Sequence, residues 1–147
     1  MNMKDERQFV GYSKYRSRLV DGHVHTELCP HGSGDRTAMM IEKAIELRIE
    51  KVCLTEHAPL PTAFAAEYGG DKKAYDTASL KLNEVDTYLE LGRQLQRAYG
   101  THIDISLGFE VDYIPGFESD IQEFLDRYGP LTDDNILSVH FMEGVNN

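Results

Sequence analysis

The segment KVCLTEH, residues 51–57, is a short and almost continuously apolar run that ends in a histidine. A strand that is buried on both faces has this composition, and such strands belong to parallel sheets that are covered by helices. Before it, residues 36–50 carry apolar side chains at helical spacing. After it, residues 58–76 contain two prolines and two glycines and predict a long loop. This segment therefore indicates an α/β fold.

Outside this region, strand and helix patterns alternate along the chain. Strands that alternate with helices form a parallel sheet with the helices outside it, so we expect four parallel strands with outer helices. Asp35 is expected to cap the first helix, and Leu82, Val85, Leu89 and Leu95 are expected to face the core from the longest one. The other strands are expected over residues 18–26, 102–113 and 134–141, and the other helices over residues 77–100 and 116–129.

Size and charge limit the function classes. At 147 residues the chain suits one domain, which we place at residues 19–147 after a polar lead-in over residues 1–18. The formal net charge of −10 disfavours nucleic acid and anionic membranes as partners, whereas the excess of carboxylates suits a site for cations. Two cysteines give no disulfide framework, and no apolar run resembles a membrane span or a signal peptide. We therefore expect a cytoplasmic protein, and the sequence does not predict its oligomeric state.

Histidines and one carboxylate fall at the ends of the expected strands. In parallel β/α folds the functional residues gather at the carboxyl ends of the strands. Alternate residues of a strand share a face, so two histidines that flank one valine can converge on one ion. Imidazole and carboxylate ligands suit Zn, Mn and Fe alike, and a carboxylate can bridge two ions. The residues concerned are His23 and His25 on the first strand, His57 on the second, Glu110 on the third and His140 on the fourth.

Further side chains lie close to these in the sequence. His31 follows the first strand in a glycine-rich loop and could swing back over the site. Asp21 shares the face of the two adjacent histidines, and with Asp112 it is a candidate to orient ligand imidazoles. Cys29 is either a metal ligand beside His31 or, more in keeping with its type, a small buried side chain. Each histidine taken alone is also compatible with an ordinary core or strand-end residue, but their regular placement on four strands favours a metal site.

Four motifs, DGHVHTELCPHG, LTEHAP, LGFEVDY and ILSVHF, occur in this order along the chain. In this order and context they resemble the histidinol-phosphatase branch of the PHP (polymerase and histidinol phosphatase) superfamily, from Leu19 onward. Members are distorted barrels of seven β/α units with three metal ions at the carboxyl ends of the strands. The resemblance implies an incomplete PHP-type (β/α)7 barrel here, because four strands cannot close a β/α barrel, which usually needs more than ~200 residues.

The resemblance also implies a reaction, the hydrolysis of L-histidinol phosphate to L-histidinol and phosphate in histidine biosynthesis. Divalent ions, up to three in a complete site, would turn a bound water into a hydroxide nucleophile and clamp the phosphate oxygens. No phospho-enzyme is then required. The implied ligand sets are His23 and His25 with Glu110 for one ion, His31 and His57 for a second, and His140 for a third toward which Glu110 bridges.

One departure from the family leaves other functions open. The chain ends seven residues after His140, before the later strands that supply a further histidine, an Asp-x-His pair and basic residues for the phosphate in the family. We therefore expect the N-terminal part of such an enzyme, with little activity alone. The alternatives are a non-catalytic fragment that binds metal or a partner, and another metal-dependent hydrolase of amidohydrolase type.

Overall fold

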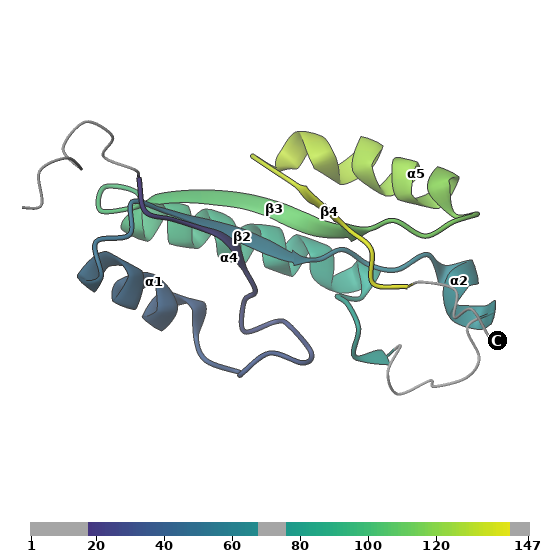
Figure 1. Cartoon of the computed structure of the whole chain (residues 1–147), viewed down its shortest axis with the longest axis horizontal. Coiled ribbons are helices and arrows are strands. Elements are labelled where there is room, and N and C mark those ends of the chain that lie inside the picture. Colours follow the sequence, from purple (N-terminus) through teal and green to yellow (C-terminus); the bar gives the residue numbers. More distant parts are fainter. Residues whose placement is uncertain (1–17, 68–75, 142–147) are drawn as a thin grey trace, which may run out of the picture.

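A computed structural model describes residues 18–67 and 76–141, and its four strands form one parallel sheet in the order β1-β2-β3-β4 (Figure 1). Within these residues β1 and β4 each pair with a single strand, so the sheet is open at both edges. The expected incomplete barrel of parallel strands is therefore confirmed. The strands are β1 (Val20–Val24), β2 (Lys51–His57), β3 (Asp104–Asp112) and β4 (Ile136–Ser138).

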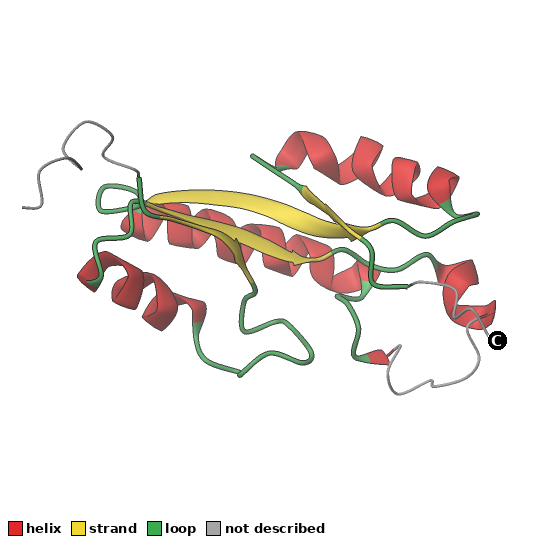
Figure 2. Cartoon of the chain, viewed as in Figure 1, coloured by secondary structure: helices red, strands yellow, loops and turns green. Residues whose placement is uncertain are grey.

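α1, α4 and α5 connect the successive strands and contribute to one hydrophobic core against the sheet (Figure 2). α1 lies between β1 and β2 in the sequence, α4 between β2 and β3, and α5 between β3 and β4. In the part of the chain that the structure describes, no helix is long and apolar enough to span a bilayer. The helices are α1 (Thr37–Glu46), α2 (Thr62–Glu67), α4 (Val85–Tyr99) and α5 (Glu118–Tyr128), with 3₁₀ turns η1 (Leu82–Glu84) and η2 (Gly129–Leu131).

The two faces of the sheet differ in composition. The covered face carries large apolar residues such as Leu54, Leu107 and Phe109, which are buried against the helices. Because alternate strand residues point to opposite faces, the other face carries the residues between them, which are small or polar. That face leads at its carboxyl end to the candidate site. Its paired positions on β2 and β3 are Cys53 with Ser106, Thr55 with Gly108, and His57 with Glu110.

A buried tyrosine on α4 holds β2 and β3 together just before this site. The Tyr88 hydroxyl lies 3.0 Å from the backbone oxygen of Leu54 and 2.5 Å from that of Gly108, and it accepts the N–H of Glu56 at 3.3 Å. Burial raises the pKa of Tyr88, so the phenol keeps its proton and remains a donor. The hydroxyl thus satisfies backbone groups that would otherwise be buried without a partner.

The chain approaches β4 by crossing very close to Gly108. Asp133 donates its N–H to the oxygen of Leu107 at 2.6 Å, and the Asn135 side chain accepts the N–H of Phe109 at 2.8 Å. These contacts take the place of ladder bonds before β4 begins at Ile136. A Cβ added at Gly108 would lie 1.4 Å from the oxygen of Asp134, so only glycine permits this crossing.

Two predictions about the first half of the chain were wrong in detail. α2 forms inside the segment that was expected to be a loop, and residues 68–75 of that segment lie outside the described part. Asp35 does not cap α1. Glu27 does so from the preceding loop, accepting the N–H of Thr37 at 2.7 Å, because the turn after β1 brings its carboxylate to the start of the helix.

The longest helix also differs from its prediction at one end. Leu82 is 57% exposed, because it lies in η1 rather than on the packed side of α4. Val85, Leu89 and Leu95 are buried as expected. The lead-in predicted for residues 1–18 lies outside the described residues, except for Arg18, which contacts Glu50.

Gly108→Ala should destabilise the fold strongly, because its methyl group would collide with backbone rather than with a movable side chain. Overpacking of this kind costs ~1–3 kcal/mol or more. Gly129→Ala is the matched control, since a Cβ there meets no atom within 4 Å, and we expect a change within ~0.5 kcal/mol. Urea unfolding of the three proteins measures both effects, and equal midpoints for the two variants would contradict the close crossing.

Candidate metal centre

A buried carboxylate on β3 lies at the centre of four imidazoles. Glu110 is 3% exposed. Its Oε2 atom lies 2.9 Å from His23 Nε2, 3.2 Å from His57 Nδ1 and 3.4 Å from His25 Nε2, and its Oε1 atom lies 3.4 Å from His140 Nε2. Residues that are far apart in the sequence therefore converge on one carboxylate at the carboxyl ends of the strands.

The strand register explains this convergence. His57 is the last residue of β2 and pairs directly with Glu110, so both point to the same face. His23 and His25 are two residues apart at the end of β1, and their ring centroids lie 4.9 Å apart. β3 pairs with β4 from Glu110 onward, and His140 follows two residues after β4 ends.

Asp21 does not lie with the histidines. The pairing of β1 with β2 shifts by one residue between Asp21 and Val24, because these two residues pair with Val52 and Leu54. A bulge of this kind reverses the alternation of faces. Asp21 therefore lies on the α1 side of the sheet, where it lines a cavity of about 310 Å³ with Val24, Val52 and residues of α1. The prediction that Asp21 shares the face of the histidines was wrong for this reason.

Three of the histidines hold their Nδ1 atom against an oxygen acceptor. His25 Nδ1 lies 3.1 Å from Glu56, and His140 Nδ1 lies 2.8 Å from Asp112. His31 Nδ1 donates to the backbone oxygen of Thr77 at 2.8 Å. Such contacts are typical of metal ligands, because they fix the ring and turn the second nitrogen toward the ion.

His31 completes a continuous group of rings. Its ring centroid lies 5.1 Å from that of His57 and 6.4 Å from that of His25. The loop after β1 therefore brings the His31 ring beside those of His25 and His57. His102 lies exposed at the amino end of β3, on the opposite side of the molecule from the centre, and Cys53 is buried within β2.

Glu56 is a residue that the sequence interpretation missed. It is fully buried, and its carboxylate accepts from Thr26 N at 2.9 Å, from Thr26 Oγ1 at 2.7 Å and from His57 N at 3.2 Å, in addition to its contact with His25. A signal was present in the sequence, because Glu56 is the one carboxylate in a strand with a mostly apolar first half. A buried carboxylate requires partners, and a histidine on the adjacent strand was available.

The pKa values follow from these contacts. The hydrogen bond to Glu56 raises the pKa of His25. Burial alone would raise the pKa of Glu56, but the bonds from His25 and Thr26 outweigh it and lower that pKa. Burial lowers the pKa of His57 despite the nearby Glu110, so this imidazole is held neutral with a lone pair available.

The arrangement suits divalent metal ions. His57 Nδ1 is buried and has no hydrogen-bond partner among the described residues, although it points toward Glu110. A cation between these atoms would satisfy both of them. Two groups have ligand atoms within 4.8 Å of one another, His23 with His25 and Glu110, and His57 with Asp112 and His140. A third such group contains His25, Glu56 and the buried Cys29.

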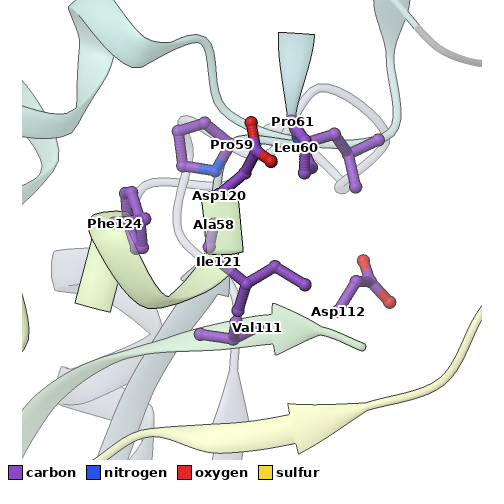
Figure 3. Close-up of a pocket in the computed structure, with 9 residues that line it drawn as sticks. All are labelled: Ala58, Pro59, Leu60, Pro61, Val111, Asp112, Asp120, Ile121 and Phe124. Atoms are coloured by element: carbon purple, nitrogen blue, oxygen red, sulfur yellow. The ribbon is translucent and has the colours of Figure 1, made fainter. Parts of the chain in front are cut away.

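A small cavity beside the centre is not the reactive side. It is lined by residues 58–61 after β2, by Val111 and Asp112, and by α5 (Figure 3). Its volume is about 40 Å³, which holds a water molecule but no substrate, since ligand pockets measure ~300 Å³ or more. The side chains of His23 and His140 are 45% and 48% exposed, so the centre is open to solvent at these two residues.

Comparisons with known proteins identify a family for this chain. Residues 21–147 match the family model described as PHP domain. The histidinol-phosphatase of Bacillus subtilis (strain 168) is 41% identical over 122 residues, which are 83% of this chain and 44% of that protein. The chain therefore spans less than half the length of the curated relatives that it matches.

Two crystal structures are similar to the fold. A protein from Listeria monocytogenes, assigned as histidinol phosphatase hisK, has a TM-score of 0.82 and 44% identity, over 85% of this chain and 46% of that one. The histidinol phosphate phosphatase of Lactococcus lactis, complexed with zinc, L-histidinol and phosphate, has a TM-score of 0.62 and 27% identity, over 86% and 41% of the two chains.

Glu110→Gln should weaken zinc binding by this chain by more than about 10-fold, because a neutral amide cannot supply the charge on which four imidazoles converge. Competition with a chromophoric chelator measures the affinity, and circular dichroism checks the fold. His102→Ala is the control, since this exposed histidine lies at the other end of β3. Equal zinc affinity in the wild type and Glu110→Gln would contradict the assignment of Glu110 as a ligand.

Proposed function

The chain belongs to the PHP domain family, and we propose that it forms the metal-binding part of a phosphatase that hydrolyses L-histidinol phosphate to L-histidinol and phosphate. The observation that carries this proposal is the buried Glu110 with four imidazole nitrogens within 3.4 Å. The family assignment favours this function over an amidohydrolase-type reaction. Relatives named as histidinol phosphatases support the substrate.

We propose that the site holds up to three divalent ions, with zinc, manganese and iron as the candidates. Zinc is supported by the related Lactococcus lactis structure. When bound, such ions acidify a water molecule and offset the negative charge of the phosphate oxygens. The proposed ligands are His23 and His25 with Glu110 for one ion, His31 and His57 for a second, and His140 with Glu110 for a third.

The residues of this chain would prepare the site for that chemistry. Glu110 supplies a negative charge that several ions can share. His57 stays neutral because burial lowers its pKa, so it needs to lose no proton before it binds. Asp112 accepts from His140 Nδ1 and keeps Nε2 of that ring toward Glu110. The reaction adds water across the P–O ester bond, and histidinol leaves as the alcohol with one proton of that water. A cytoplasmic location remains a prediction.

Because the chain spans only part of the length of its relatives, a chimera with one of them tests the proposal. Residues 21–147, placed in the Bacillus subtilis histidinol-phosphatase instead of its matching segment, should release phosphate from L-histidinol phosphate when zinc or manganese is added. We expect a turnover on the order of 10 per second. EDTA should abolish it, and metal should restore it. The 147-residue chain alone should stay near background, because the described strands form a sheet that is open at both edges.

Matched variants of the chimera identify the residues responsible. Glu110→Gln should remove activity, whereas Glu90→Gln, on the exposed side of α4, should not change it. A folded chimera that binds zinc yet hydrolyses no phosphate ester would refute the proposed phosphatase activity. A chimera that hydrolyses other phosphate esters but not L-histidinol phosphate would refute the proposed substrate assignment.

A further inference from the structure

Glu56 is a buried charge that is surrounded by hydrogen-bond donors. Its Oε2 atom accepts from the backbone N–H and the hydroxyl of Thr26 at 2.9 and 2.7 Å. Its Oε1 atom accepts from the backbone N–H of His57 at 3.2 Å and faces His25 Nδ1 at 3.1 Å. Each carboxylate oxygen has about two acceptor positions, so these four contacts use the whole capacity of the group.

The position of the proton on His25 follows from this arrangement. The hydroxyl and both backbone N–H groups donate to Glu56, and hydrogen bonds of this kind stabilise the ionised carboxylate. An ionised carboxylate has no hydrogen to give, so the remaining contact requires a proton on His25 Nδ1. The other nitrogen of the same ring, Nε2, lies 3.4 Å from Glu110. A neutral His25 with its proton on Nδ1 therefore directs the Nε2 lone pair to the metal centre.

We propose that Glu56 is a positioning residue that holds His25 as the Nδ1–H tautomer and so prepares its Nε2 atom for a metal ion. The tautomer of His25 depends only on contacts within the chain. The further step, that this tautomer serves metal binding, rests on the function proposed above. Glu56 fills the role that was expected of Asp21, from the neighbouring strand rather than from the strand of the histidine itself.

The same carboxylate also holds the turn that leads to His31. Thr26, whose N–H and hydroxyl both donate to Glu56, accepts the N–H of Cys29 on its backbone oxygen at 3.1 Å. Its hydroxyl oxygen accepts the N–H of Leu28 at 3.2 Å. Glu56 therefore fixes one ligand ring directly and the start of the loop that carries another.

A direct role of Glu56 as a metal ligand fits less well. Its ligand atoms lie within 4.8 Å of those of His25 and Cys29. However, both oxygens are already occupied by four donors, two of which are backbone N–H groups that cannot move away. A cation on Glu56 would leave these buried donors without partners, which costs ~1–3 kcal/mol for each.

The first test needs no substitution. Long-range ¹H–¹⁵N correlation spectra of the metal-free 147-residue chain distinguish the two neutral tautomers and the doubly protonated ring. At a pH high enough to make His25 neutral, we expect its proton on Nδ1, and zinc should then shift the Nε2 resonance. A neutral His25 with its proton on Nε2 would overturn the proposal. If the tautomer is Nδ1–H and zinc does not bind, the proposed function fails while the role of Glu56 stands.

Glu56→Gln provides the second test. The amide must present its NH2 group either to the donors of Thr26 or to His25 Nδ1. In the second case Nδ1 becomes the acceptor and the proton moves to Nε2. We expect the neutral His25 to lose its uniform Nδ1–H state and zinc affinity to fall ~10–100-fold. An unchanged tautomer together with unchanged zinc affinity would overturn the proposal.

Glu27→Gln is the matched control. Glu27 also accepts from a backbone N–H and a hydroxyl, both of Thr37, but it lies at the start of α1 and has no hydrogen bond to a histidine among the described residues. Its substitution should lower the unfolding midpoint without changing the His25 tautomer. If Glu27→Gln altered the tautomer as Glu56→Gln does, the effect would reflect general loosening and the positioning role would be refuted.

Discussion

The buried negative charge of Glu110 is the constraint around which the described structure is organised. A carboxylate that is 3% exposed has lost its water and requires compensation by cations or by hydrogen-bond donors. Imidazoles from three different strand ends provide this compensation, and each ring is a donor when protonated and a metal ligand when neutral. The same contacts that make the metal-free centre tolerable therefore make it a good site for divalent ions.

The sheet supports this centre by using its two faces differently. Large apolar residues on one face hold α1, α4 and α5, and they provide most of the hydrophobic core. Small residues on the other face let the chain come close to the sheet, as it does where it crosses Gly108 before β4. The Tyr88 hydroxyl then joins β2 to β3 at the level of Glu56. His23, His57 and Glu110 thus lie on strands, and His25 and His140 lie one and two residues beyond a strand end.

Much of this arrangement could be predicted from local patterns. The bounds of β2 are those expected, because an apolar run that ends in a polar residue has clear limits. His57 and Glu110 meet because parallel strands end at the same edge. The alternation rule failed at Asp21, since a bulge in β1 cannot be seen in the sequence. Glu56 was missed because its partners come from the turn after β1, whose path depends on tertiary packing.

The spatial order of the strands, which is also their order in the sequence, has a consequence for synthesis on the ribosome. Each new strand can pair with the one made just before it, so no early strand has to wait for a distant partner. Three of the imidazoles, on residues 23, 25 and 57, emerge before Glu110 does. The carboxylate therefore reaches a place where its partners are already present, and its burial need not pass through a stage in which the charge is isolated.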